Sequence, residues 1–165
     1  MIVEDAGVRG AGEDKLAEMP VERLEEEIAT LAGHLNAGTC RWLLLVAEFD
    51  RRDGWAAWGC RSCAQWLSWR CGVAPGAARE QLRVARSVAG LAGVRAEFEA
   101  GRLSYSQVRA LTRVASGENE EELLELARHA TAAQLERIVR GYRAASRLAD
   151  DARRAHEARE GLLVA

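Results

Sequence analysis

Three arginines on one predicted helix are the side chains best suited to bind a ligand. Residues 75–89 read PGAAREQLRVARSVA, and Pro75 suits the first turn of a helix. Arg79, Arg83 and Arg86 follow at spacings of four and three, so they share one face of that helix. A planar guanidinium matches a guanine edge or a phosphate. We therefore predict that these three side chains point outward, unpaired, along a DNA groove.

The segment around this helix has the layout of a helix-turn-helix. A first helix is predicted over residues 63–71 and ends at Gly72, and the second helix begins three residues later. In such units the second helix enters the major groove. The alternative is an ordinary pair of helices with solvated arginines, and Ala74 stands where a Ser or Thr cap is usual. The pattern leaves both interpretations open.

Charge is unevenly distributed along the 165 residues, whose net charge is −2. Residues 1–30 carry a net charge of −6, whereas residues 60–115 hold nine arginines and three glutamates, a net charge of +6. A basic segment is the electrostatic footprint of nucleic-acid binding, although arginine-rich helix faces are often only solvated. We predict additional phosphate contacts at Arg102, Arg109 and Arg113, and double-stranded DNA as the partner.

Helix signals dominate the sequence, and strand signals are nearly absent. Three Ser/Thr-x-x-Gln motifs each precede an apolar-periodic stretch, as capping boxes do: Ser62 with Gln65, Ser104 with Gln107, and Thr131 with Gln134. Apolar spacing predicts a first helix from Pro20 to about Arg52, with a break or a weak spot at residues 36–38. Further helices are expected near 63–71, 75–89, 93–100, 105–115, 118–129 and 132–158. The predicted fold is all-α, a multi-helix bundle that contains the helix-turn-helix-like unit.

The chain divides into three predicted regions. Residues 1–18 form an acidic leader that we expect to be disordered, and residues 19–148 form a helical accessory domain. Apolar positions thin out beyond Leu148, so residues 149–165 are interpreted as a helix end and tail, either a truncated linker or a dimer element. The N-terminus lacks the pattern of a secretory signal, and no long apolar run exists. We expect a cytoplasmic protein without a membrane span.

The cysteines and tryptophans allow two interpretations each. Cys60-x-x-Cys63 followed by Cys71 has metal-like spacing, but no fourth ligand lies nearby, so we expect buried, reduced thiols and no metal or cofactor. The five tryptophans fall within residues 42–69. Aromatic side chains between arginines can stack on single-stranded bases, whereas a helix-crossing core is the commoner arrangement. We favour the core, with Trp66 the surest member and Trp58 the residue most readily expected to be exposed.

A resemblance covers residues 42–145, about two-thirds of the chain. The residues that carry it are Phe49-Asp50 with Gly54-Trp55, Ser62-Cys63-Ala64-Gln65-Trp66-Leu67, Gly72, Ala78-Arg79-Glu80 with Leu82-Arg83-Val84-Ala85, and GRLSYSQVRALTR at 101–113. This combination resembles an actinobacterial family, the domain of unknown function number 222 or 13E12-repeat family. The resemblance implies a nucleic-acid context, because members of that family usually carry a C-terminal HNH endonuclease domain.

The nuclease itself is not expected in this chain. An HNH site needs clustered histidines around a divalent metal, and only His129 and His156 follow residue 120. No nucleophile–base pair, Walker loop or dinucleotide fingerprint is present either. We therefore predict no enzyme activity for this chain, which is expected to be the accessory domain.

Two functional hypotheses follow. The leading one is a non-catalytic DNA-binding or DNA-handling module of an HNH-nuclease-type protein. The alternative is a protein-interaction or regulatory domain that docks on a C-terminal HNH domain or another partner without touching DNA. Oligomerisation through the C-terminal helix is compatible with both. A third interpretation, a truncated fragment without an independent role, also remains.

Overall fold

The computed structural model describes residues 16–163, and helices are the only regular secondary structure in this part of the chain. The predicted all-α fold is therefore confirmed, whereas residues 1–15 of the predicted leader lie outside the described residues. The elements are α2 (Val21–Arg51), the 3₁₀ turn η1 (Ala56–Trp58), α3 (Cys63–Cys71), α4 (Pro75–Ala89), α5 (Ala92–Glu99), α6 (Tyr105–Leu111), α7 (Glu120–His129) and α8 (Ala132–Leu163).

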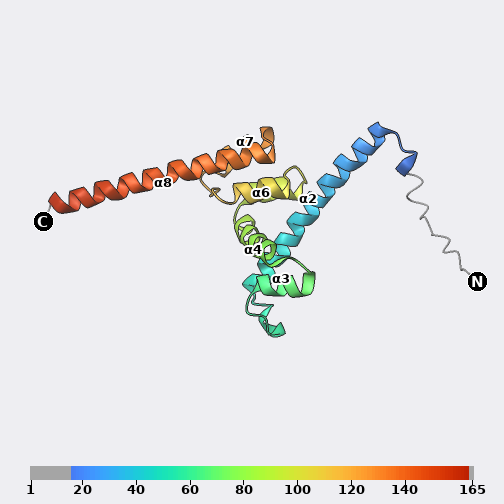
Figure 1. Cartoon of the computed structure of the whole chain (residues 1–165), viewed down its shortest axis with the longest axis horizontal. Helices are drawn as coiled ribbons and strands as arrows, with labels where there is room; N and C mark the ends of the chain where they lie inside the picture. The colour runs from blue at the N-terminus through green and yellow to red at the C-terminus, as the bar shows by residue number, and fades with distance from the viewer. Residues whose placement is uncertain (1–15, 164–165) are drawn as a thin grey trace, which may run out of the picture.

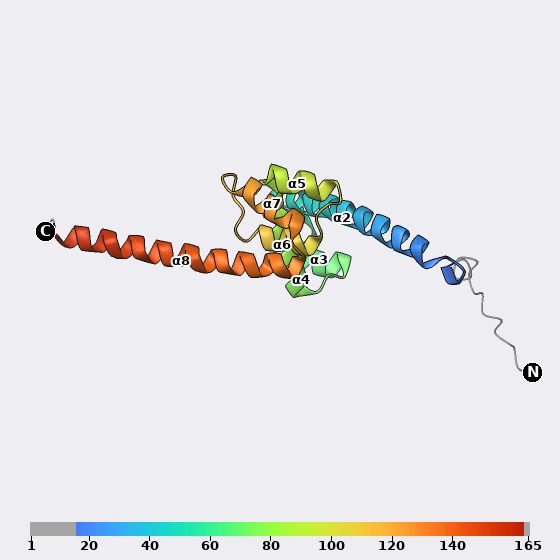
Figure 2. The same ribbon diagram turned by 90° about the horizontal axis from the view of Figure 1, so that it is seen from above.

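A small helical body carries two long arms (Figures 1 and 2). The C-terminal half of α2 packs against α4 and α5, and the first part of α8 packs against α6 and α7. The N-terminal half of α2 and the rest of α8 extend from opposite ends of the body. The consecutive helices α3 and α4 contact each other across the turn formed by residues 72–74. The protein therefore has two kinds of solvent-facing surface, one on the body and one along the two projecting helices.

Helix starts follow the capping motifs closely. The reciprocal hydrogen bonds of a capping box are present at two of the three motifs, Ser104 with Gln107 and Thr131 with Gln134. At the third, Ser62 Oγ accepts from the backbone N–H of Gln65 at 3.2 Å, but the Gln65 side chain accepts from the backbone N–H of Arg61 instead. The Ser62 cap is therefore confirmed without its reciprocal partner.

Helix ends differ from the prediction at two places. The sequence predicts a helix to residue 115, but α6 ends at Leu111 because the chain tightens there into bonds between residues three apart: the N–H of Arg113 reaches the carbonyl of Ala110, and that of Val114 the carbonyl of Leu111. The helix α8 continues to Leu163, beyond the predicted 158. No break occurs at residues 36–38, so α2 is one continuous helix.

The hydrophobic core lies in the body and draws on α2 to α8. Its largest fully buried side chains are Phe98, Leu43, Leu67, Leu103, Leu111 and Leu135. Each such side chain contributes about 1.5–3 kcal/mol relative to an exposed position. Trp66 is partly buried against this core, as predicted, and its ring contacts Phe49 with a centroid separation of 4.5 Å. The core therefore fixes the short helices around the C-terminal half of α2.

The cysteines only partly match the expectation of buried thiols. Cys63 is buried, and burial raises its thiol pKa to about 11. Cys71 is exposed, so the prediction was wrong for this residue. It is the last residue of α3, where the helix ends outside the core. Among residues 16–163, no group of three or more His, Cys, Asp or Glu side chains could hold a metal ion. No helix in this range is long and apolar enough to span a membrane.

One glycine connects the turn after α5 to the middle of α2. Gly101 has φ +75°, in the left-handed region that favours glycine. A Cβ atom at this position would lie 2.4 Å from the carbonyl oxygen of Gly33, which is too close for a van der Waals contact and would be a steric clash with the backbone. The carbonyl oxygen of Gly101 also accepts a hydrogen bond from the Asn36 side chain at 3.3 Å. The body is therefore held close against α2 at this point.

We predict that Gly101→Ala destabilises the fold more than Gly72→Ala. Both positions have positive φ, which costs about 1–2 kcal/mol for alanine. Only Gly101 adds a backbone clash, because nothing lies within 4 Å of a Cβ at Gly72. The clash should cost roughly another 1–3 kcal/mol in urea unfolding experiments. Equal losses for the two variants would contradict the close packing of this turn on α2.

Candidate nucleic-acid interface

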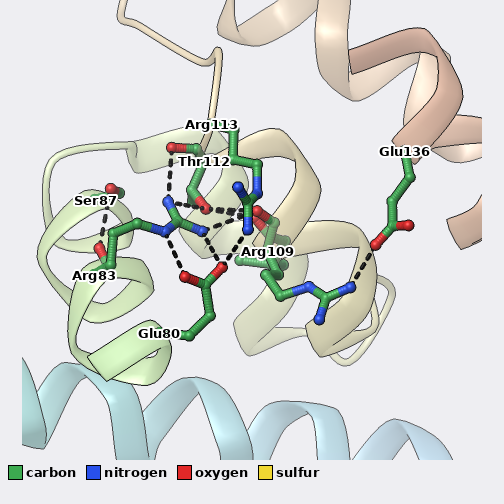
Figure 3. Close-up of polar contacts among 8 residues, drawn as sticks. Glu80, Arg83, Ser87, Arg109, Thr112, Arg113 and Glu136 are labelled. Carbon is green, nitrogen blue, oxygen red and sulfur yellow. Dashed lines mark hydrogen bonds and ion pairs between the residues drawn. The ribbon is translucent and has the colours of Figure 1, made fainter. Parts of the chain in front are cut away.

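Arg83, the middle arginine of the predicted recognition helix, is turned toward α6 (Figure 3). Its guanidinium donates to the backbone carbonyls of Thr112 at 3.2 Å and Arg109 at 3.1 Å, and to both carboxylate oxygens of Glu80. The two carbonyls lie at the C-terminal end of α6, where backbone carbonyls have no N–H group four residues farther along the helix to pair with. Arg83 therefore closes the end of α6 and is not available to a DNA groove.

Glu80 holds two arginines at once. One of its carboxylate oxygens lies 3.0 Å from Arg83 Nη2 and 2.8 Å from Arg113 Nη2 (Figure 3). The hydrogen bond from Arg83, followed by the charges of Arg83 and Arg113, lowers the pKa of Glu80 below its usual value. Farther along, Arg109 pairs with Glu136 of α8. These ion pairs link α4 to α6, and α6 to α8.

The other predicted contacts also have internal partners, except one. Arg86 pairs with Asp50 of α2 at 2.9 Å, and Arg102 pairs with Glu97 at 2.6 Å. The expectation of unpaired side chains was therefore wrong for Arg83 and Arg86. Helical spacing correctly placed these arginines on one face, but α2 and α6 flank that face and supply the carboxylate and carbonyl acceptors. Arg79 alone of the six predicted contacts is exposed and forms no ion pair within the described residues.

Unpaired cations gather instead around α3. Residues 61–79 contain three arginines and no acidic residue, a net charge of +3. Arg61, Arg70 and Arg79 are exposed and have no carboxylate partner among residues 16–163. Arg79 lines a groove of about 230 Å³ between α3 and the start of α4, which Gln65 and Ser68 also line. This end of the body is consequently electropositive.

Two exposed tryptophans lie at the same end of the body. Trp58, in η1, is 57% exposed, and Trp69, in α3, is 61% exposed. Their ring centroids are 6.0 Å apart. Trp69 adjoins Arg70 in sequence, and Trp58 lies three residues before Arg61. Large aromatic faces open to solvent beside unpaired guanidinium groups can bind flat, negatively charged ligands, because the rings stack and the cations pair with phosphate.

The sequence indicated only part of this cluster. The exposure of Trp58 was predicted and is confirmed, whereas Trp69 was assigned to the core with the other tryptophans. Trp69 lies one turn beyond Gln65 on the exposed side of α3, while Cys63 and Leu67 supply the buried side. That alternation along α3 was the signal that would have separated Trp69 from Trp66.

The site and the fold together define an all-helical domain with a basic, aromatic end. Comparison with family models matches residues 22–160 to the domain of unknown function DUF222, and the chain belongs to this family. The resemblance inferred from the sequence is thereby confirmed. No curated protein and no solved structure matches the chain.

We predict that Glu80→Gln lowers stability near neutral pH by roughly 1–2 kcal/mol, because Arg83 and Arg113 lose their shared carboxylate at a partly exposed site. Glu80 has a lowered pKa in the fold, so its contribution is present above its ordinary pKa of 4.5. The contribution is lost as the pH falls below 4.5 through the folded-state pKa. The difference between wild type and variant in chemical denaturation should therefore shrink in acid.

The matched control is Glu118→Gln. Glu118 is exposed and forms none of the ion pairs of the described residues. We expect this variant to stay within about 0.5 kcal/mol of wild type at neutral pH. A comparable loss for both variants, or a Glu80 effect that does not change between neutral and acidic pH, would show that the shared carboxylate contributes little.

Proposed function

We propose that this chain is a non-catalytic nucleic-acid-binding module whose binding surface is the α3 face, defined as Trp58, Arg61, Trp69, Arg70 and Arg79. The observation that carries the proposal is the exposed tryptophan pair beside arginines that have no internal partner. These arginines can bind phosphate without giving up a contact that stabilises the fold. Of the six contacts expected from the sequence, the proposal keeps only Arg79.

Stacking and charge would act together on this face. A base stacked on an aromatic side chain contributes about 1–3 kcal/mol, with little dependence on its identity. A guanidinium that neutralises a phosphate releases bound counterions, so its contribution falls as salt rises. The exposed rings serve bases that are not already paired and stacked in a duplex. The proposed ligand is therefore single-stranded or locally unpaired nucleic acid, in preference to the double-stranded DNA expected from the sequence.

The setting of this activity follows from the sequence resemblance. Members of the family that the sequence resembles usually carry an HNH endonuclease domain, which acts on nucleic acid. In the proposal, this chain holds the strand while a separate nuclease domain performs the chemistry. The α3 face needs no reacting group for that role, because it only has to bind and position the strand.

The test is a titration of a labelled single-stranded oligonucleotide, and of the matching duplex, at several salt concentrations. We predict that the triple variant Arg61→Ala/Arg70→Ala/Arg79→Ala binds the single strand more weakly than wild type. Its dependence of log affinity on log salt should flatten by about 2, since each lost phosphate contact on a single strand contributes about 0.7. Trp58→Ala/Trp69→Ala should reduce single-strand binding with little change in this salt dependence.

The matched control is Arg137→Ala/Arg140→Ala/Arg143→Ala. These three arginines of α8 are also exposed and have no carboxylate partner within residues 16–163, so the variant removes the same charge elsewhere. It should change the affinity less than the α3-face variant does. A larger loss of affinity in the α8 variant would instead show that the nucleic acid binds at α8. A wild-type protein without measurable affinity for either nucleic acid would reject the proposal and favour docking on a protein.

A further inference from the structure

The N-terminal half of α2 exposes a row of apolar side chains. Val21 is 74% exposed, Ile28 67%, Leu31 57% and Leu35 63%. With Leu24 they follow at spacings of three and four residues, the heptad spacing of a coiled-coil seam. The row from Val21 to Leu35 is about 20 Å long at the rise of an α-helix. We call these five residues the α2 stripe.

The stripe lies on the side of α2 that the body does not cover. The contacts that fix α2 to the turn after α5 come from Gly33 and Asn36, which lie about a third of a turn or more around the helix from Leu31 and Leu35. Farther along the same heptad series, Trp42 packs on the core, and its indole N–H donates to Gln81 at 3.3 Å. The body therefore covers this side of α2 only from about Trp42 onward, and the stripe lies on the preceding part of the helix, which projects as an arm (Figure 1).

A groove runs beside the stripe. Its volume is about 380 Å³, and Leu16 and Met19, which precede α2, line it together with Leu24, Ile28 and Leu31. An exposed apolar seam with an adjoining groove of this kind is a surface suited to a second helix. The charges beside the seam indicate which helix fits.

Residues 21–35 carry four glutamates and one arginine, a net charge of −3. Two parallel copies of α2 would place these acidic segments side by side. In an antiparallel pair centred between Ile28 and Leu31, each acidic end instead lies near the middle of the other α2. In this register residues 22–27 of one copy face residues 32–37 of the other, which contain no acidic side chain. Arg41, which is exposed and has no ion pair within the described residues, lies one turn beyond the residue that faces Glu22. The charges therefore favour the antiparallel arrangement.

The same register also brings the apolar residues of the two stripes into contact with each other. Ile28 of one copy packs against Leu31 of the other, Leu24 against Leu35, and Val21 against Gly38, where a Cβ would meet nothing within 4 Å in the single chain. At the flank, Glu27, one carboxylate oxygen of which accepts from Arg23 of its own helix at 2.7 Å, lies opposite His34 of the other copy, and an imidazole N–H can donate to a carboxylate. Apolar layers and flanking charges agree on one register.

We propose that the α2 stripe is the interface of a homodimer, formed by an antiparallel pairing of α2 with α2 of a second copy. This surface is separate from the α3 face, so the inference goes beyond the proposed function and does not depend on it. It also differs from the sequence-based idea of a dimer through the C-terminal helix.

The first test compares oligomeric state by sedimentation equilibrium of the full chain. Wild type should dimerise, and Ile28→Glu/Leu31→Glu should raise the dimer dissociation constant on the order of 100-fold or more, because four charges enter an apolar seam. The control Leu148→Glu alters an apolar residue of α8 that is 70% exposed and should leave the dimer intact. Circular dichroism should show unchanged helicity for both variants.

Several outcomes would overturn the proposal. A wild-type chain that stays monomeric would do so, and would leave the stripe to residues 1–15 or to a different protein. A dimer that survives Ile28→Glu/Leu31→Glu would exclude the stripe, and one that Leu148→Glu dissociates would place the interface on α8. Oligonucleotide affinity of the monomeric variant, measured in parallel, reports on the α3 face independently.

The second test exchanges charges across the proposed register. Glu27→Arg and His34→Glu should each weaken the dimer several-fold, since each variant brings like charges or unmatched groups together. The double variant should regain most of the wild-type affinity. Glu27 and His34 are two turns apart on one helix, so they do not contact each other within a chain. Restoration would therefore identify a contact between copies, and additive losses would reject the antiparallel register.

Discussion

The carboxylate of Glu80 is the interaction on which the arrangement of the body depends. It binds Arg83 and Arg113 together, and Arg83 in turn closes the carbonyl end of α6. The helix α6 is short and contributes few backbone hydrogen bonds of its own, so its position relies on such contacts. Arg109 then transfers the connection from α6 to α8. These polar contacts thus add directional links between α4, α6 and α8 to the apolar core that the same helices share.

This network divides the arginines of the chain into two groups. Arg83 and Arg86 of α4, together with Arg109 and Arg113, are internal connectors, which explains why a basic stretch of sequence does not become a basic surface. Arg61, Arg70 and Arg79 have no such partner within the described residues, and Arg61 and Arg70 are close in sequence to Trp58 and Trp69. Net charge along the sequence therefore overstates the cationic surface at α4 and α6. The proposed binding face follows from which side chains the fold leaves unpaired.

Local signals predicted local structure well. Capping residues and apolar spacing gave the bounds of α3 and α4, and the confirmed family resemblance covered most of the chain. The candidate site was predicted less well, because Asp50 and Glu136, which pair with Arg86 and Arg109, come from distant parts of the sequence. Spacing within one helix cannot reveal which element will face it. The exposed position of Trp69 is different, because the spacing of Cys63 and Leu67 along α3 already indicated it.

The absence of any interruption in α2 has a geometric consequence. This helix runs from the arm to its end at Arg51, close to η1 and α3, so one continuous helix connects the arm to the end of the body that carries the α3 face. In an antiparallel pair of such helices, the two Arg51 ends would be separated by on the order of 60 Å at the rise of an α-helix. The length of the continuous helix would then set the distance between the two α3 faces of the proposed dimer, and with it the length of nucleic acid between them.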